Sequence, residues 1–410
     1  MDARTRHTMH GIMSEFSGWV KTLAQESQHV DGPQSAHALE QRLRQEGQRM
    51  LGRLFEKLLQ NALDHQPAAR TCPRCGKRRR HRGVRPRGLI SSVGAIRLSG
   101  PYWHCWDCGG QHALDALADD SVSGPMCELL CLLGTALASF AKASAASEKL
   151  LGVRVSDSFI RRLCHRRGRR VTVEPVPIEP TGCQHVVGSC DGTMVNTRQD
   201  GWRELKAYQF RHGSHKHGRA YLEPSGCFVP RLRKAAMALK VDRAEQVVWV
   251  ADAADWIDKG VRIQLPMAVR IIDIWHARQH VHEAAMQIYP DDDAKARAWA
   301  LRYCRDLEDY GGKAVWRRLR HATYRQAYRQ AAVDTLRKYL KKNAARLDYP
   351  AFRKAGYPIS SGPMESFCKQ LGQRLKGPGM RWSKHNVTPM AALVSLWSNG
   401  EWDGHWQTVA

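Results

Sequence analysis

The runs QHVVGSC (184–190), QVVWVA (246–251) and AVRII (268–272) indicate the fold class of the second half of the chain, and each is followed by an aspartate: Asp191, Asp252 and Asp273. Short apolar runs rich in Val and Ile are typical of buried strands. Two more candidate strands, residues 202–210 and 219–222, follow the first run, and a helix over about 229–240 precedes the second. The order βββαβαβ predicts an α/β fold.

Carboxylates at these strand ends are candidate metal ligands. Clustered carboxylates repel one another unless divalent cations neutralise them, and Mg²⁺ prefers such oxygen ligands. The residues Ser360-Ser361-Gly362-Pro363 predict the start of a helix, and a third carboxylate, Glu365, falls in its first turn. We expect Asp191, Asp252 and Glu365 to hold two Mg²⁺ ions, or Mn²⁺, for a displacement at phosphorus.

Neighbouring residues leave alternatives for this site. Asp255 and Asp258 are rivals of Asp252, and Asp273 is another candidate for the second carboxylate ligand. The commoner fate of a single aspartate is a helix cap or a surface charge. Lys369 lies one helical turn after Glu365, on the same face, where it can hold a DNA phosphate.

Two Cys-x2-Cys pairs, Cys72 with Cys75 and Cys105 with Cys108, stand in the first half of the chain with 29 residues between them. A glycine follows each pair, so four thiolates can converge on one Zn²⁺ ion. The spacing predicts a zinc ribbon whose metal is structural, because four thiolates leave no position for water. A redox-active pair is the alternative, but the thioredoxin-like context is absent.

A basic run follows the first cysteine pair. Such a run is usually a solvated face, but beside a ribbon in a strongly basic chain it indicates contacts with phosphates. Its members are Lys77, Arg78, Arg79, Arg80, His81, Arg82, Arg85 and Arg87.

Helices are predicted on both sides of the ribbon. Residues 35–65 form an amphipathic pattern whose apolar stripe packs on its own domain or, alternatively, on a second copy. In residues 126–168 one helix ends at Gly152, and Ser156 can cap a second helix that carries Arg161 and Arg162. This order predicts a DNA-binding helix-turn-helix, with an ordinary helical hairpin as the alternative. The prolines at 175, 177 and 180 mark residues 171–181 as a linker.

Composition narrows the class of partner. The 410-residue chain has 64 Lys and Arg against 39 Asp and Glu, a net charge of +25, which favours a polyanion such as nucleic acid. A soluble basic enzyme is the alternative. The longest uncharged apolar stretch, between Glu128 and Lys142, is shorter than the ~20 residues of a membrane span, and the N-terminus lacks a signal-peptide core. We therefore expect a cytoplasmic, nucleoid-associated protein that does not bind membranes and whose 12 cysteines are reduced.

Four motifs, in order, resemble those of the insertion-sequence DDE transposases of the Mutator-like type, near the ISKra branch. They are Asp191-Gly192-Thr193, DAADWI (252–257), Asp273-Ile274-Trp275-His276 and Met364-Glu365-Ser366. The resemblance covers about 184–396. It implies an RNase H-like mixed sheet with Asp191, Asp252 and Glu365 as the catalytic triad, and it implies that His276 assists DNA strand processing nearby.

The resemblance also implies a domain order. A helical insertion (283–355) that grips DNA, or alternatively only caps the fold, would divide the catalytic domain into 182–282 and 356–400. Before the catalytic domain we expect N-terminal helices (1–68), the zinc ribbon (69–115) and the helical DNA-binding region (116–170). A homodimer is expected, because a transposase must join two DNA ends.

The implied function is cutting the ends of an insertion element at its terminal repeats and joining them to target DNA. A structure-specific nuclease of the same fold and a non-catalytic DNA-binding regulator are the alternatives. In the late basic loop we expect Arg381 to contact the DNA backbone and Trp382 to stack on an unpaired base, unless Trp382 belongs to the core. The histidines at 212, 215 and 217 are expected in a DNA-facing loop rather than a second metal site.

Overall fold

The chain divides, in the computed structural model, into two compact units, residues 1–167 with 406–410 and residues 168–405. The structure describes residues 3–65, 70–116, 121–172, 175–178 and 185–409. The predicted strand residue Gln184 and the linker residue Pro180 lie outside these ranges. Among the helices in these ranges, none is both long and apolar enough to cross a membrane.

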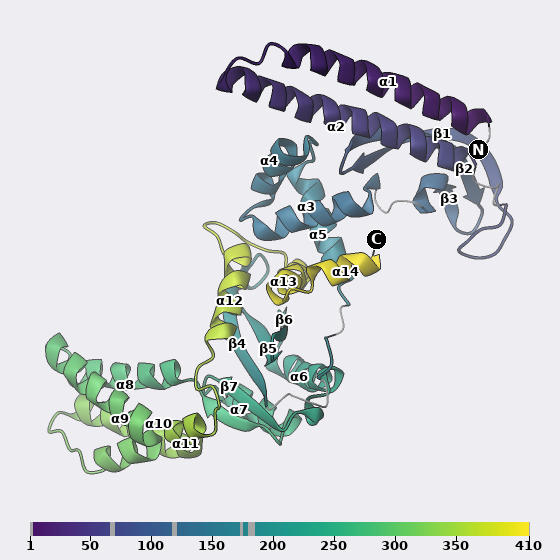
Figure 1. The fold of residues 1–410 in the computed structure, drawn as a ribbon. Helices are drawn as coiled ribbons and strands as arrows, with labels where there is room; N and C mark the ends of the chain where they lie inside the picture. The colour runs from purple at the N-terminus through teal and green to yellow at the C-terminus, as the bar shows by residue number, and fades with distance from the viewer. Residues whose placement is uncertain (1–2, 66–69, 117–120, 173–174, 179–184, 410) are drawn as a thin grey trace. The chain divides into compact units, whose positions relative to one another are not determined.

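The N-terminal unit begins with a helical hairpin of α1 (Ala3–Ser27) and α2 (Pro33–Asp64) (Figure 1). The two helices run antiparallel, since Lys57 forms an ion pair of 2.7 Å with Glu15 and the Trp19 indole donates to Glu46. The amphipathic helix predicted over 35–65 is therefore confirmed. Its apolar stripe is only partly covered, because the side chains of Leu43 and Leu58 are 48% and 45% exposed.

A three-stranded antiparallel sheet, β1 (Arg80–Ser91), β2 (Gly94–Cys105) and β3 (Gly109–His112), follows the hairpin. Leu63, near the end of α2, packs with Leu89, Ile96 and Leu98 in the core of this part. The helices α3 (Gly124–Ala136), α4 (Phe140–Leu151) and α5 (Asp157–Arg169) come next. Gly152 ends α4 in the left-handed conformation, and Ser156 accepts a hydrogen bond from the Phe159 N–H at the start of α5, as the sequence predicts.

The C-terminal unit is built on a mixed five-stranded sheet in the order β6-β5-β4-β7-β8. β4, β5 and β6 form an antiparallel meander, and β7 and β8 run parallel to β4. The bounds are β4 (His185–Thr197), β5 (Gly201–His212), β6 (His215–Tyr221), β7 (Gln246–Ala251) and β8 (Val269–Ile272). The predicted βββαβαβ order is confirmed, so this unit has the α/β fold class.

Helices cover both faces of this sheet. Alternate residues of β7 point to opposite sides: Trp249 joins a core with Phe228 of α6 (Ser225–Leu239), and Val250 joins a core with the helices after β8. A short helix, α7 (Asp255–Gln264), connects β7 to β8. The remaining helices are α8 (Ile274–Ile288), α9 (Asp293–Leu319), α10 (Ala327–Asn343), α11 (Tyr349–Lys354), α12 (Gly362–Leu375), α13 (Lys384–Asn399) and α14 (Trp402–Val409).

Two expectations about the sheet need correction. β4 does not end at Asp191 but continues to Thr197, because its outer half pairs with β5 up to Gly201. The expected DNA-facing histidine loop is a tight hairpin between β5 and β6. His217 is buried in β6, where its Nδ1 lies 2.7 Å from Glu401, and only His215 of the three is exposed.

Glu401 ties β6 to the last helices. Its carboxylate accepts hydrogen bonds from His217 and, at 2.6 Å, from the Arg219 guanidinium. Burial raises the pKa of Glu401, but the hydrogen bond from His217 and the charge of Arg219 outweigh it and leave the pKa below its usual value. Burial lowers the pKa of His217, so the neutral ring donates to Glu401. Both groups therefore bind protons more readily in the unfolded chain than in the folded one.

Replacing Glu401 tests this network. At pH 7, Glu401→Ala should destabilise the protein by about 3 kcal/mol, since it removes the carboxylate that pairs with the buried Arg219. The stabilisation that depends on Glu401 is present above its unfolded pKa of about 4.5 and is lost as the pH falls below that value, because its pKa is lower in the folded protein. The difference in melting temperature between wild type and variant should therefore persist from pH 7 to about pH 5 and shrink at lower pH. Glu245→Ala, at an exposed position, is the control; a difference that stays constant with pH would contradict the assignment.

Candidate active site and zinc ribbon

The parallel register aligns three aspartates on neighbouring strands. Gly188 of β4 pairs with Trp249 of β7, so Asp191 and Asp252 each lie three residues beyond the same paired position. Ala251 pairs with Ile272 of β8, which places Asp252 beside Asp273. Asp191, Asp252 and Asp273 thus form a row across β4, β7 and β8.

Asp273 joins the two helices that carry His276 and Glu365. It is completely buried and caps α8, accepting hydrogen bonds from the backbone N–H groups of Trp275 at 2.7 Å and His276 at 3.2 Å. Its other oxygen accepts from the backbone N–H and, at 2.9 Å, from the hydroxyl of Ser361. Because Ser361 is the residue before α12, one carboxylate fixes the start of both helices.

This junction brings Glu365 to the row of aspartates. Glu365 lies in the first turn of α12, as predicted, and the ligand atoms of Asp273, His276 and Glu365 all lie within 4.8 Å of one another. These three residues could hold a metal ion. Asp273 already accepts from four donors, so it is better suited to positioning than to coordination.

Asp191 lies beside the same helix. It lines an open groove together with Glu365 and Cys368, and the Cys368 thiol hydrogen bonds to its carboxylate. Burial raises the pKa of Asp191 above its usual value; the hydrogen bond from the Gly192 backbone N–H and the electrostatic interaction with His276 lower the pKa, and the charge of Asp252 adds to the rise. Asp191 therefore lies within electrostatic reach of both Asp252 and His276.

Asp255 and Asp258, the alternatives to Asp252 as metal ligands, form ion pairs with basic side chains. Asp255 is exposed and forms an ion pair of 2.7 Å with Lys342, and Asp258 is held by Arg270 and Arg346. Both are on α7, whereas Asp252 directly follows β7 and is half-buried. The cations beside Asp255 and Asp258 make these carboxylates poor metal ligands.

Basic side chains lie at the groove and elsewhere on the surface. Lys369 is exposed and lines the groove with Lys376 and Gln373. Arg161 and Arg162 are exposed on α5, and Arg381 is exposed between α12 and α13. These positions leave the guanidinium and ammonium groups open to a phosphate backbone.

The stacking role expected of Trp382 does not fit the structure. Trp382 is only 6% exposed, and its indole N–H donates to the Leu375 carbonyl at 3.0 Å. Its backbone pairs with the end of β4, and the buried Arg374 lies over its ring at 5.2 Å. Trp382 belongs to the core, where it holds the segment after α12 against β4.

The four ribbon cysteines converge in the N-terminal unit. All four sulfur atoms lie within 4.8 Å of one another, and Gly76 and Gly109, which end the two knuckles, adopt positive φ angles of 73° and 79°. A cluster of four thiols at this spacing fits tetrahedral zinc. The members are Cys72, Cys75, Cys105 and Cys108.

The pKa values of the cysteine thiols are also compatible with a bound cation. The pKa of Cys72 falls to about 6, chiefly because the Arg74 backbone N–H hydrogen bonds to its sulfur. The pKa of Cys108 rises to about 12, chiefly because of its hydrogen bond with Cys75. One thiolate forms readily, and a bound cation would favour ionisation of the other thiols.

Some residues of both sites escape prediction from the sequence. Cys368 contacts Asp191. The sequence could have indicated this residue, because Cys368 lies three residues after Glu365 and the two therefore share one face of the helix. Gln111 donates to the Cys72 sulfur at 3.5 Å and accepts from Arg79 at 2.7 Å. No sequence pattern predicts that Gln111 contacts a cysteine sulfur, because polar residues near strand ends have many different roles.

Zinc content tests the ribbon. The purified chain should hold about one zinc ion, and Cys72→Ser should lower that to near zero, since the metal would lose a buried ligand. Cys227→Ser, at an exposed cysteine outside the cluster, should keep the zinc. Elemental analysis by mass spectrometry measures both; equal zinc in the two variants would contradict the site.

Comparison with known proteins adds little to this geometry. No protein-family model and no curated protein matches the chain. Among solved structures, the chain is similar to the Drosophila P element transposase strand transfer complex, with 9% sequence identity over 71% of this chain and 81% of that chain and a TM-score of 0.27. A likeness of this size shows nothing about the activity of the chain.

Proposed function

We propose that the chain is a DDE-type DNA transposase with an RNase H-like catalytic domain, similar to the Mutator-like insertion-sequence enzymes. The observation that carries the proposal is the row of aspartates on β4, β7 and β8 with Glu365 of α12 beside it. The sheet order, with an antiparallel meander followed by two parallel strands, supports the proposal, because it is the order expected of an RNase H-like domain. The helices between α8 and α11 would be its insertion.

In this proposal Asp191, Asp252 and Glu365 hold the metal ions and Asp273 positions them. Two Mg²⁺ ions bound there would supply an activated water and offset charge on the attacking and leaving oxygens. The side chains of Lys369 and Lys376, which line the groove with Asp191, would bind phosphates on either side of the reacting one. His276, in the first turn of α8, lies close enough to Glu365 to contact the strand being processed.

The proposed reaction has two phosphoryl transfers. Water first cleaves the phosphodiester at each element end, and the freed 3′-hydroxyl then attacks a target phosphodiester. No covalent link between protein and DNA is needed. Arg161 and Arg162 on α5 would read the terminal repeats, and the basic ribbon would add attraction that does not depend on sequence.

Asp191→Asn tests the chemistry. Incubated with element-end DNA, target DNA and Mg²⁺, the wild type should give cleaved and joined products. The variant should lose both by roughly 10³-fold, about 4 kcal/mol, because a metal ligand is removed. DNA binding should remain, since Asp191 is not a phosphate-binding group.

The matched control is Asp255→Asn, an exposed aspartate that is ion-paired with Lys342. It should keep near-normal activity; if it is inactive while Asp191→Asn is active, the assignment is wrong. Cleavage without joining would favour the structure-specific nuclease. DNA binding with no product in the wild type would favour the regulator.

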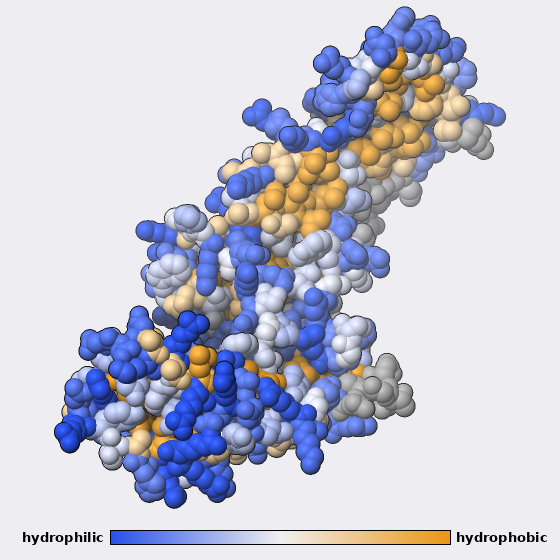
Figure 2. Space-filling view, turned by 60° about the vertical axis from the view of Figure 1, so that its left-hand side comes forward, coloured by the Kyte–Doolittle hydropathy of each residue, from blue (hydrophilic) through white to orange (hydrophobic). Residues whose placement is uncertain are grey.

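A transposase that joins two ends needs two protomers, and α1 offers a surface for this contact. Met9, Met13, Phe16 and Val20 recur at helical spacing on one face of α1 and are each more than 40% exposed. Figure 2 shows orange, apolar atoms gathered on the surface of the N-terminal unit. We propose that this stripe packs on its counterpart in a homodimer.

Light scattering tests the dimer. The wild type should have twice the chain mass of 46.4 kDa, and the double variant M13E/F16E should have the mass of one chain, because two charges would enter an apolar contact. Glu40→Lys, on the neighbouring helix and exposed, is the charge-changing control and should stay dimeric. A wild type that is monomeric at micromolar concentration would contradict the contact.

A further inference from the structure

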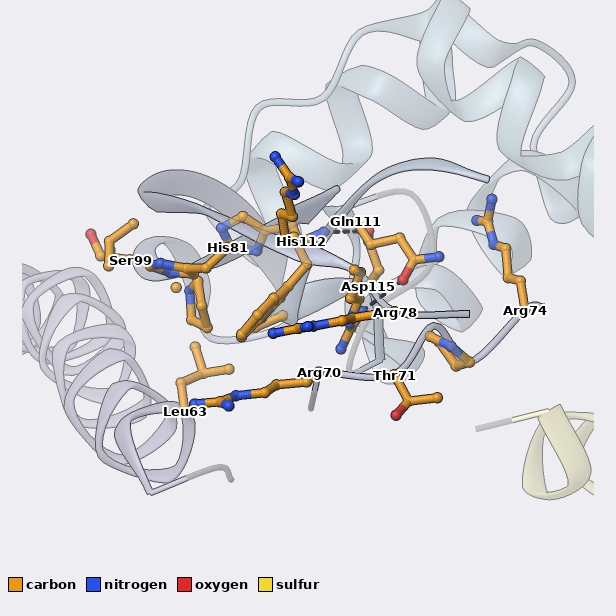
Figure 3. A pocket seen from close by; sticks show the side chains of 18 of the residues that line it. Leu63, Arg70, Thr71, Arg74, Arg78, His81, Ser99, Gln111, His112 and Asp115 are labelled. Carbon is orange, nitrogen blue, oxygen red and sulfur yellow. Dashed lines mark hydrogen bonds between the residues drawn. The ribbon is translucent and has the colours of Figure 1, made fainter. Parts of the chain in front are cut away.

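A large groove lies between the end of α2 and the zinc ribbon (Figure 3). Its volume is about 1490 Å³, more than the ~300–1,000 Å³ of small-ligand pockets. Leu63 lies at its α2 end, and Figure 3 shows the side chains of Arg70, Arg74 and Arg78 around it. The dimensions suit a chain-like ligand rather than a metabolite. We name this space the ribbon groove.

The ribbon groove is positively charged. Its lining has five arginines, Arg70, Arg74, Arg78, Arg79 and Arg80, against two aspartates, Asp64 and Asp115. The Asp64 carboxylate accepts a hydrogen bond from Gln60, and Asp115 is paired with Arg87. Within the described part of the chain no carboxylate forms an ion pair with the following groove arginines and their neighbour on β1: Arg70, Arg74, Arg78, Arg80 and Arg82. Such a set of cations without counter-charges fits a polyanion.

Aromatic side chains are interleaved with these cations. Trp106, between the ribbon cysteines, is 68% exposed, and the guanidinium groups of Arg80 and Arg82 each lie 6.0 Å from its ring centroid. Trp103 lies deeper, with Arg79 at 5.2 Å and the His81 ring at 5.0 Å. A large exposed aromatic side chain at a charged groove is unusual for a packing residue and typical of a stacking platform.

The metal site holds part of this platform in place. Gln111 is buried and joins the Cys72 sulfur to Arg79, which in turn lies over Trp103. The orientation of Arg79 is therefore coupled to the zinc knuckle. The ribbon groove is a built surface rather than a chance gathering of basic side chains.

We propose that the ribbon groove binds single-stranded DNA, with phosphates on Arg70, Arg74 and Arg78 and an unpaired base stacked on Trp106. Duplex DNA offers phosphates but no free base face, so Trp106 distinguishes the two. This inference deepens the proposed function, in which single-stranded ends arise when the element is cut. The recognised chemistry, a phosphodiester chain with unpaired bases, is shared by DNA and RNA.

Fluorescence anisotropy with the full-length protein tests the proposal. The probes are labelled oligo(dT), an abasic strand of equal phosphate number, a duplex and oligo(U). Trp106→Ala should weaken oligo(dT) binding by roughly 5- to 150-fold, the stacking contribution of one base, and leave abasic-strand and duplex binding unchanged. Trp397→Ala, at another exposed tryptophan (51%), is the matched control and should bind oligo(dT) normally.

A second variant tests the charge. Arg78→Gln should weaken binding of every strand and reduce the slope of log affinity against log salt by about 0.7, as expected for one phosphate contact on a single strand. Equal oligo(dT) affinities for Trp106→Ala and wild type would overturn the proposal. A tenfold preference of the wild type for the duplex or for oligo(U) would overturn the assignment to single-stranded DNA.

The same measurements distinguish this proposal from the catalytic one. If the wild type gives no cleaved or joined DNA but binds oligo(dT) through Trp106, the transposase function fails and the ribbon groove stands. If it cleaves and joins DNA but binds oligo(dT) without Trp106, only the ribbon groove fails.

Discussion

The buried carboxylate of Asp273 is the constraint on which the candidate active site depends. Asp273 directly follows β8, and its carboxylate caps α8 by accepting hydrogen bonds from two backbone N–H groups. It also accepts hydrogen bonds from the backbone N–H and the hydroxyl of Ser361 at the start of α12. Two helix starts that are 88 residues apart in sequence are thereby fixed to one point of the sheet. Since Glu365 lies four residues after Ser361, the position of Glu365 relative to the strands follows from this junction. A buried charge that satisfies four donors is costly to replace, because each donor would lose its partner.

The strands and their aspartates were predictable because a buried strand has a strong local signature. An apolar run followed at once by a polar residue marks the strand end before Asp252 and Asp273, and it marks the half of β4 that precedes Asp191, although β4 continues to Thr197. The parallel register then places Asp191 level with Asp252. The helix start before Glu365 was predictable for the same reason, from Ser361, Gly362 and Pro363. The coordination role of these carboxylates stays a prediction, as do the DNA contacts of Arg161, Arg162, Lys369 and Arg381.

Long-range contacts were not predictable from the sequence. The burial of Trp382 depends on pairing with the end of β4, nearly two hundred residues earlier, and a Gly-rich basic loop resembles an exposed one until that pairing is known. The extension of β4 past Asp191 depends on β5, and the burial of His217 depends on Glu401. In each case tertiary packing decides between two locally reasonable conformations. The same holds for Asp255 and Asp258, whose ion pairs with cations on other elements remove them from the choice of metal ligands.

The charged side chains that contribute to the net charge of +25 are distributed differently in the two units. In the C-terminal unit, Asp191, Asp252 and Asp273 lie in a row across the sheet, and burial, with a smaller contribution from the charge of Asp252, raises the pKa of Asp191. The nearby Lys369 and Lys376 are exposed at the groove that Asp191 lines. In the N-terminal unit arginines gather at the ribbon groove beside the exposed Trp106, and among the described residues no carboxylate forms an ion pair with Arg70, Arg74 or Arg78. Carboxylates that could hold metal ions and basic side chains open to a polyanion are complementary features, and the proposed DNA substrate with its divalent cations would match both.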